Sequence, residues 1–173
     1  MTAPVKPQVN LNIQPVILTD SNGNNAATTI EYVQSDIANA NLVWQQASIQ
    51  FNTLTPILLP DSADLTTSSV AQRQALTSLV SAPGAFKVYY VSGCTDDLGL
   101  LGRTCPTGVV ICMVNRNNTT TLTIANLAHE LGPAQGLPDV NNTVNLMTMT
   151  TSSILEADIT IAQVNSLTTT SSQ

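Results

Sequence analysis

The sequence predicts a single domain of the α/β (α+β) class, with helices packed against a mixed sheet. Some stretches show alternating or β-branched apolar residues, which indicate strands, and others show apolar residues at helical spacing. Strands and helices that alternate along a chain favour a sheet covered by helices. The 173 residues fit one domain, 1–173, that can bury its own core. We expect the core to span about residues 9–168 and the Ser/Thr-rich tail, 169–173, to be disordered.

The first predicted element is a strand near the N-terminus. Val9, Leu11 and Ile13 alternate with polar residues, which predicts a half-buried strand that continues toward Leu18. The polar run from Ser21 to Asn25 then predicts a turn. Further strands are predicted where short apolar or β-branched runs occur, at 49–52, 56–59, 86–91 and 108–114.

Helices are predicted between these strands and after them. Thr28-x-x-Glu31 has the form of a capping box, so a helix should open there and end near Ala47. Its apolar residues recur at helical spacing and should face the core: Ile30, Val33, Ile37, Ala40 and Trp44. Other helices are expected at 69–80, from about 121 onward, and from a second capping box at 160–163 through 167, while 92–107 should be loop.

Composition limits the classes of partner. Charged residues make up 9% of the chain and the formal net charge is −6. Five Lys and Arg residues are too few for binding phosphate backbones, so nucleic acid is not expected as a partner. The longest apolar runs are far too short to cross a bilayer, so no membrane association is expected. The N-terminus has no apolar segment typical of a secretory signal. The acidic, Ser/Thr/Asn-rich composition nevertheless favours an extracellular or secreted protein. A monomer is expected.

Two loop features leave alternatives open. Cys94, Cys105 and Cys112 fall within one short stretch, and they predict either a Cys94–Cys105 disulfide or three reduced thiols. One cysteine remains free in any pairing, because the count is odd. The acidic pair Asp96-Asp97 is interpreted as a solvated loop, with a structural calcium site as the alternative because calcium prefers carboxylate oxygens.

The most informative segment follows the third predicted helix start. Residues 129–139 read HELGPAQGLPD and residues 145–148 read NLMT. Two histidines four residues apart lie on one helical face, and a glutamate between them can reach a metal-bound water. In this chain the first such position is His129 and the second is Pro133. Gly136 can end the helix in a turn, because glycine tolerates left-handed dihedral angles.

This pattern resembles the metzincin clan of zinc metallopeptidases, whose motif reads H-E-x-x-H-x-x-G-x-x-H and is followed by a Met-turn. The resemblance implies zinc as cofactor, His129 and Asp139 as its ligands and Glu130 as the general base. Aspartate as the third ligand is typical of the snapalysin type. The resemblance covers about residues 9–168 and implies a metzincin-like catalytic domain. Such a domain has a mixed twisted sheet, two long helices, an active-site helix, a Met-turn at Met147 and a C-terminal helix.

The sequence departs from the family at the second ligand. Pro133 has no lone pair to give a metal, and its ring would clash with the carbonyl of His129 in a helix, at a cost of about 3 kcal/mol. We therefore expect the helix to kink or stop near Gly132. Asp139 has a second interpretation as well, because aspartate also stabilises turns such as the one after Pro138.

Two functions follow from these residues. One is a zinc endopeptidase, impaired or inactive as written, in which a zinc-bound water attacks the peptide bond and Glu130 takes its proton. Its peptide substrate would lie along the Gly108–Met113 stretch as an edge strand. The other is a non-catalytic pseudopeptidase that binds a protein or peptide, because a catalytic zinc normally has three protein ligands. Pro133 could also be a substitution introduced into an active enzyme.

Overall fold

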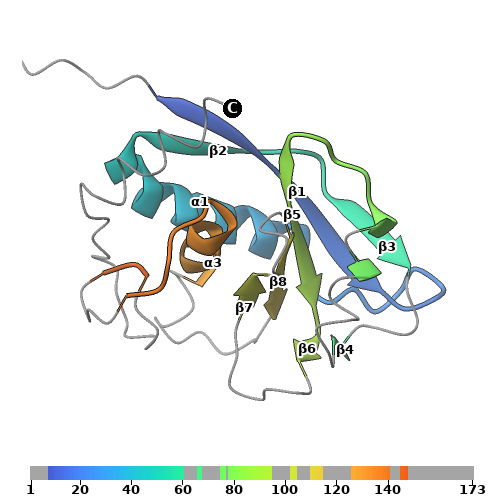
Figure 1. The fold of residues 1–173 in the computed structure, drawn as a ribbon. Coiled ribbons are helices and arrows are strands. Elements are labelled where there is room, and N and C mark those ends of the chain that lie inside the picture. The colour runs from blue at the N-terminus through green and yellow to red at the C-terminus, as the bar shows by residue number, and fades with distance from the viewer. Residues whose placement is uncertain are drawn as a thin grey trace, which may run out of the picture.

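Strand β1 (Val9–Thr19) is an internal strand of the main sheet, with paired strands on both of its sides (Figure 1). The computed structural model describes residues 8–60, 66–67, 75–76, 78–94, 102–104, 110–114, 126–140 and 145–147. Within these residues the main sheet has six strands in the order β2-β1-β5-β8-β7, with β3 paired to the second half of β1. The bounds of the added strands are β2 Ile49–Thr53, β3 Ile57–Pro60, β5 Ala85–Val91, β7 Gly102–Thr104 and β8 Val110–Val114.

The sheet is mixed, as the sequence predicts. The pairs of β1 with β2, β3 and β5, and of β5 with β8, are parallel, whereas β7 runs antiparallel to β8. A separate parallel pair joins β4 (Thr66–Thr67) to β6 (Gly93–Cys94). The prediction of loop throughout 92–107 is therefore wrong at β6 and β7. Both strands are short and lack the alternation of apolar residues that identifies a strand in a sequence.

The strand predicted at 108–114 does not lie at an edge. The described part of it, β8, pairs with β5 on one side and with β7 on the other. The expectation that the Gly108–Met113 stretch offers a free edge is wrong, because Ile111, Cys112 and Met113 are already paired with β7. Among the described strands, β7 occupies the end of the sheet on this side and lies alongside helix α3 (Asn126–Ala134).

The core lies on both faces of the sheet. β1 shows alternating burial only at its start, and every residue from Ile13 to Thr19 is buried. The prediction of a half-buried strand thus holds only for its first residues, because a central parallel strand is covered on both faces. Ile13 and Ile17 belong to the larger apolar cluster, with the helices, whereas Val16 and Leu18 belong to a second cluster on the other face.

Helix α1 (Ile30–Trp44) covers the first face together with α3 (Figure 1). A 3-10 turn, Gln45–Ala47, continues α1 to the end predicted for it, and Ser48 reverses the chain at φ 58°. Most of the predicted apolar face is buried: Val33, Ile37, Ala40 and Trp44. Ile30, however, is 42% exposed. It is the first residue of the helix.

The N-cap of α1 differs from the predicted capping box. Thr29, and not Thr28, has the extended backbone of an N-cap, and its Oγ1 accepts a hydrogen bond from Tyr32 N at 3.2 Å. Two adjacent threonines can each supply the same cap, and the sequence pattern selected the wrong one. Glu31 therefore stands one position too early to close a capping box.

Several predictions involve residues outside the described ranges. They include the C-terminal helix at 160–167, the Asp96-Asp97 pair and Cys105 of the proposed disulfide. Of the helix predicted at 69–80, the described residues 75–76 and 78–79 are helical, and Leu76 is buried in the second cluster. None of the helices in the described part is long and apolar enough to span a membrane.

Candidate functional site

Helix α3 carries the first part of the candidate site, and it passes through Pro133. The helix runs to Ala134, so the expectation that it would kink or stop near Gly132 is wrong by two residues. Pro133 lies in the last turn, where its missing N–H removes one helical bond, to the carbonyl of His129. Only Ala134 follows Pro133 in the helix, so the proline disrupts little helical structure.

The end of α3 is a Schellman motif centred on Gly136. Gly136 has φ 88°. Its N–H donates to Pro133 O at 2.9 Å, and Leu137 N donates to Gly132 O at 3.0 Å. These are the two bonds that define the motif, and its left-handed residue is usually glycine. Leu137 is buried, so the chain turns back against the helix and carries Asp139 toward His129. The predicted role of Gly136 is confirmed.

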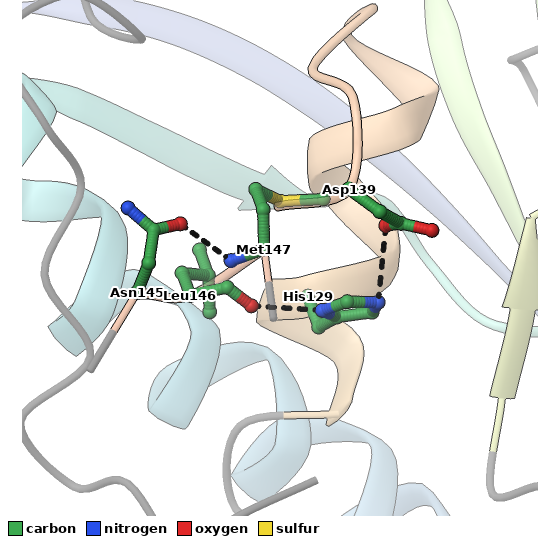
Figure 2. A network of polar contacts seen from close by, with 5 residues as sticks. All are labelled: His129, Asp139, Asn145, Leu146 and Met147. Atoms are coloured by element: carbon green, nitrogen blue, oxygen red, sulfur yellow. Dashed lines mark hydrogen bonds and ion pairs between the residues drawn. The ribbon is translucent and has the colours of Figure 1, made fainter. Parts of the chain in front are cut away.

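His129 and Asp139 lie side by side (Figure 2). His129 Nε2 and Asp139 Oδ1 are 3.9 Å apart, which is too long for a hydrogen bond. Two atoms bonded to one zinc at about 2.0–2.2 Å each can be at most about 4.4 Å apart, so the spacing is compatible with a shared ion. The two side chains are 25% and 49% exposed, which leaves the pair open to a metal from solvent.

The ring of His129 is oriented by a backbone carbonyl. Its Nδ1 lies 2.8 Å from Leu146 O. Because a carbonyl oxygen only accepts, Nδ1 carries a proton, and the neutral ring then presents the lone pair of Nε2 on the side of Asp139 (Figure 2). Metal-binding histidines in proteins almost always donate their second ring N–H in this way.

The turn at residues 145–147 supports both candidate ligands. Asn145 Oδ1 accepts a hydrogen bond from Met147 N at 2.8 Å and closes the turn. Leu146 O holds His129, and Met147 O accepts from Val140 N at 2.8 Å, next to Asp139. All three turn residues are buried. One short turn beneath the pair therefore fixes the separation of two residues ten positions apart in the sequence.

Met147 packs directly against Gly132 of α3. A Cβ at Gly132 would lie 2.8 Å from Cε of Met147 and nearer still to its Sδ. Gly132 thus allows the turn to approach the helix. This role of Gly132 was not predicted from the sequence. The signal for it is a glycine inside a predicted helix, which costs about 1 kcal/mol and so needs a packing reason.

Among the described residues, the contact between His129 and Asp139 brings two candidate metal ligands together, whereas a catalytic zinc site normally has three protein ligands. No group of three His, Cys, Asp or Glu residues suited to one metal occurs within the described ranges. His129 is the only histidine of the chain, so a further protein ligand would have to be a carboxylate or a thiolate. Pro133 stands four residues after His129 on the same helical face, where the resembled family has its second histidine. Glu130 is half-buried on α3 beside His129.

Trp44 links the site helix to α1. Its Nε1 donates to Ala128 O at 3.0 Å, and the side chain is fully buried. Trp44 was predicted as a core residue, which the structure confirms, but a bond to a backbone carbonyl 84 positions away leaves no trace in a sequence pattern. It anchors α3 immediately before His129.

The fold is similar to that of a solved metalloproteinase. No protein family matches the chain by its sequence profile, and no curated protein matches it. The crystal structure of metalloproteinase-II from Bacteroides fragilis superposes with a TM-score of 0.63 at 14% sequence identity. The match covers 92% of this chain and 53% of the other, so the chain spans about half the length of that protein. The likeness establishes a metallopeptidase-like α+β fold.

Proposed function

We propose that the chain is a metzincin-type zinc metallopeptidase domain whose metal site is incomplete as encoded, so that it holds zinc weakly and hydrolyses peptides poorly. The observation that carries the proposal is the pair His129 and Asp139, 3.9 Å apart, with the histidine ring oriented by Leu146 O. The metallopeptidase-like fold supports it independently.

The proposal assigns a separate part to each residue of the site. His129 and Asp139 would hold zinc, which as a bound Lewis acid supplies an activated water and a polarised carbonyl. Glu130, the residue after His129 on α3, would accept the proton of that water as the general base. Pro133 occupies the place of the missing ligand. Losing even a residue that merely orients a ligand costs about 10–100-fold in metal affinity, so the loss of a ligand itself should cost more.

A non-catalytic role in binding peptides is the second candidate. The two-ligand set favours it, because a catalytic zinc site requires three protein ligands. An extended peptide could add to the sheet by main-chain hydrogen bonds. Since β8 is paired on both sides, the strand available to such a peptide is β7, at the end of the described sheet and alongside α3.

Restoring the ligand tests the proposal. We expect Pro133→His to raise zinc affinity by at least about tenfold, measured by competition with a zinc-binding dye. Pro133→Ala is the matched control, because it also removes the proline from the helix but adds no ligand. If the histidine variant binds zinc no better than the alanine variant, this account of the site is wrong.

Peptidase activity separates the two candidate functions. We expect Pro133→His with zinc to cleave an unstructured protein such as casein, and Glu130→Gln in the same background to abolish the cleavage. Zinc binding without any cleavage would favour the pseudopeptidase. In that case the unmodified chain should still retain a peptide on an affinity column without hydrolysing it.

A further inference from the structure

We propose that the loop from Asp20 to Glu31, between β1 and α1, binds a calcium ion. The loop has twelve residues and reads DSNGNNAATTIE. The calcium loop of an EF-hand has the pattern D-x-[DN]-x-[DN]-G-x5-E, with ligands at positions 1, 3, 5, 7, 9 and 12. Here Asp20, Asn22 and Asn24 occupy positions 1, 3 and 5, and Glu31 occupies position 12. This assignment is separate from the candidate zinc site and rests on none of its residues.

The one departure within the pattern is at position 6, where glycine makes a sharp turn. Asn25 stands there, and its φ is 51°. Asparagine is among the few residues other than glycine that adopt the left-handed conformation readily. The backbone of this loop thus makes the turn that the pattern requires at its sixth residue, with a different side chain.

Asp20 already organises the first half of the loop. Its Oδ1 accepts from the N–H groups of Asn22 at 2.9 Å and Asn24 at 2.8 Å, and its Oδ2 accepts from Asn25 Nδ2 at 2.8 Å. The hydrogen bond from the backbone of Asn24 is the main cause that lowers the pKa of this carboxyl. An ionised Asp20 with a remaining lone pair on Oδ2 is suited to a hard cation.

The second half of the loop contains a buried hydroxyl that lacks a partner. Thr28 is only 5% exposed, and its Oγ1 has no hydrogen bond to any described residue. Buried polar groups nearly always have a hydrogen-bond partner, so we expect a water or an ion to contact this oxygen. Thr28 is residue 9 of the loop, the position from which such loops reach calcium directly or through a water. The N-cap of α1 does not use it, because Thr29 makes the cap.

Backbone hydrogen bonds close the first half of the loop and hold its second half against the end of β1. Ala27 N donates to Leu18 O at 2.8 Å, and Asp20 N donates to Asn24 O at 2.8 Å. The returning segment with Thr28 therefore runs beside the end of β1, from which Asp20 emerges. Glu31 follows in the first turn of α1, with an exposed side chain. A strand stands in place of the entering helix of an EF-hand, but both flanks of the loop are fixed elements.

The ligand charges predict a weak site. Only Asp20 and Glu31 bring carboxylates, whereas Asn22 and Asn24 bring neutral amide oxygens, and calcium affinity rises with ligand charge. We expect a Kd of about 10⁻⁴–10⁻³ M, as in extracellular calcium modules. Magnesium should bind more weakly, because it demands near-ideal octahedral geometry and gives up its water reluctantly.

The test is a calcium titration of the whole chain followed by NMR. We expect one calcium per chain and shifts of the amide signals of Gly23 and Asn25. About 10 mM CaCl₂ should raise the thermal midpoint by about 3–11 °C. No binding at that concentration, shifts confined to other segments, or an equal effect of MgCl₂ would overturn the proposal.

Three variants locate the site, with Asp139→Asn as the control for a lost carboxylate elsewhere. Asp20→Asn and Glu31→Gln should each lower calcium affinity about tenfold or more. Glu31→Gln keeps the proposal testable should Asp20→Asn disturb the loop. Thr28→Val should reduce the calcium-induced rise in midpoint without lowering the midpoint of the metal-free protein. If all three variants bind calcium as the wild type does, the proposed site is wrong. The control, Asp139→Asn, should bind calcium as the wild type does.

Discussion

Gly132 lies under the side chain of Met147 so closely that a Cβ would overlap its sulfur. The contact joins the last turn of α3 to the turn that supports His129 and Asp139. Because Met147 is fully buried, its side chain has little room to move away. The separation of helix and turn, and with it the geometry of the candidate site, depends on this absent methyl group.

Gly132→Ala should therefore destabilise the protein by about 1–3 kcal/mol, as overpacking of a core does. In a solvated helix the same change would stabilise by up to about 1 kcal/mol, so the sign alone is informative. Urea unfolding gives the free energy. Adding Met147→Ala should remove the clash, so that the two changes are strongly non-additive in a double-mutant cycle. Additive effects would show that the two residues do not press on one another.

The protonated nitrogen of His129 can be observed directly, because it is the only histidine of the chain. We expect the neutral ring to carry its proton on Nδ1, which lies 2.8 Å from Leu146 O. The ¹⁵N chemical shifts of the imidazole distinguish the two tautomers, and added zinc should perturb Nε2 first. A ring protonated on Nε2 would mean that Leu146 does not orient it.

The buried carboxyl of Asp36 should make the free energy of unfolding depend on pH. It is buried in α1 and accepts a hydrogen bond from Tyr90 Oη at 3.0 Å. Burial is the main cause that raises its pKa to about 7, and the bond from Tyr90 opposes the shift. Between about pH 4 and pH 7 the folded state keeps a proton that the unfolded state has lost. Stability contributed by this group is therefore complete below about pH 4 and falls as the pH rises to about 7.

Asp36→Asn should flatten that part of the stability profile. The variant keeps an acceptor for Tyr90 but has no charge to bury, so it should gain on the order of a few kcal/mol over the wild type at neutral pH. Chemical unfolding at a series of pH values measures the effect. Parallel profiles of the two proteins between pH 4 and pH 7 would contradict the assignment.

The N-cap of α1 can be located by two adjacent substitutions. Thr29→Ala removes the acceptor of Tyr32 N and should cost about 1 kcal/mol. Thr28→Ala, measured without calcium, should cost less, because the hydroxyl of Thr28 has no described partner. If thermal or urea unfolding shows a larger loss of stability for Thr28→Ala than for Thr29→Ala, Thr28 is the N-cap, as the predicted capping box requires.

The sequence predicted the elements whose signal is local. The alternation at Val9–Ile13 and the β-branched and aromatic run at 86–91 identified β1 and β5 to within a residue or two. The glycine after α3 was correctly placed in a helix-ending turn, because the left-handed conformation at Gly136 is a property of that residue. β7 escaped prediction, since three residues that are held by pairing with β8 carry no pattern of their own.

The sequence pointed to the residues of the candidate site, but it did not predict the contacts that hold them in place. His129, Asp139 and Met147 were singled out by the resemblance to the metzincin motif; the structure places His129 beside Asp139 and Met147 against Gly132 of the same helix. The hydrogen-bond contact of His129 with Leu146 O and the packing of Met147 on Gly132 could not be predicted. Every residue has a backbone carbonyl, and no sequence pattern shows which parts of the chain approach each other in the fold. The effect of Pro133 was overestimated, since the cost of a proline depends on how much helix follows it.

The bond from Trp44 to Ala128 has a consequence for the order of assembly during translation. Every described strand precedes α3 in the chain, and β1 leaves the ribosome first, so the strands of the sheet are available before the site helix exists. Domains begin to fold while they are synthesised. Until Ala128 emerges from the ribosome, the indole N–H of Trp44 cannot donate its hydrogen bond to the carbonyl of that residue. As the chain's only tryptophan, it gives a fluorescence signal that would time the closure of the site on a nascent chain.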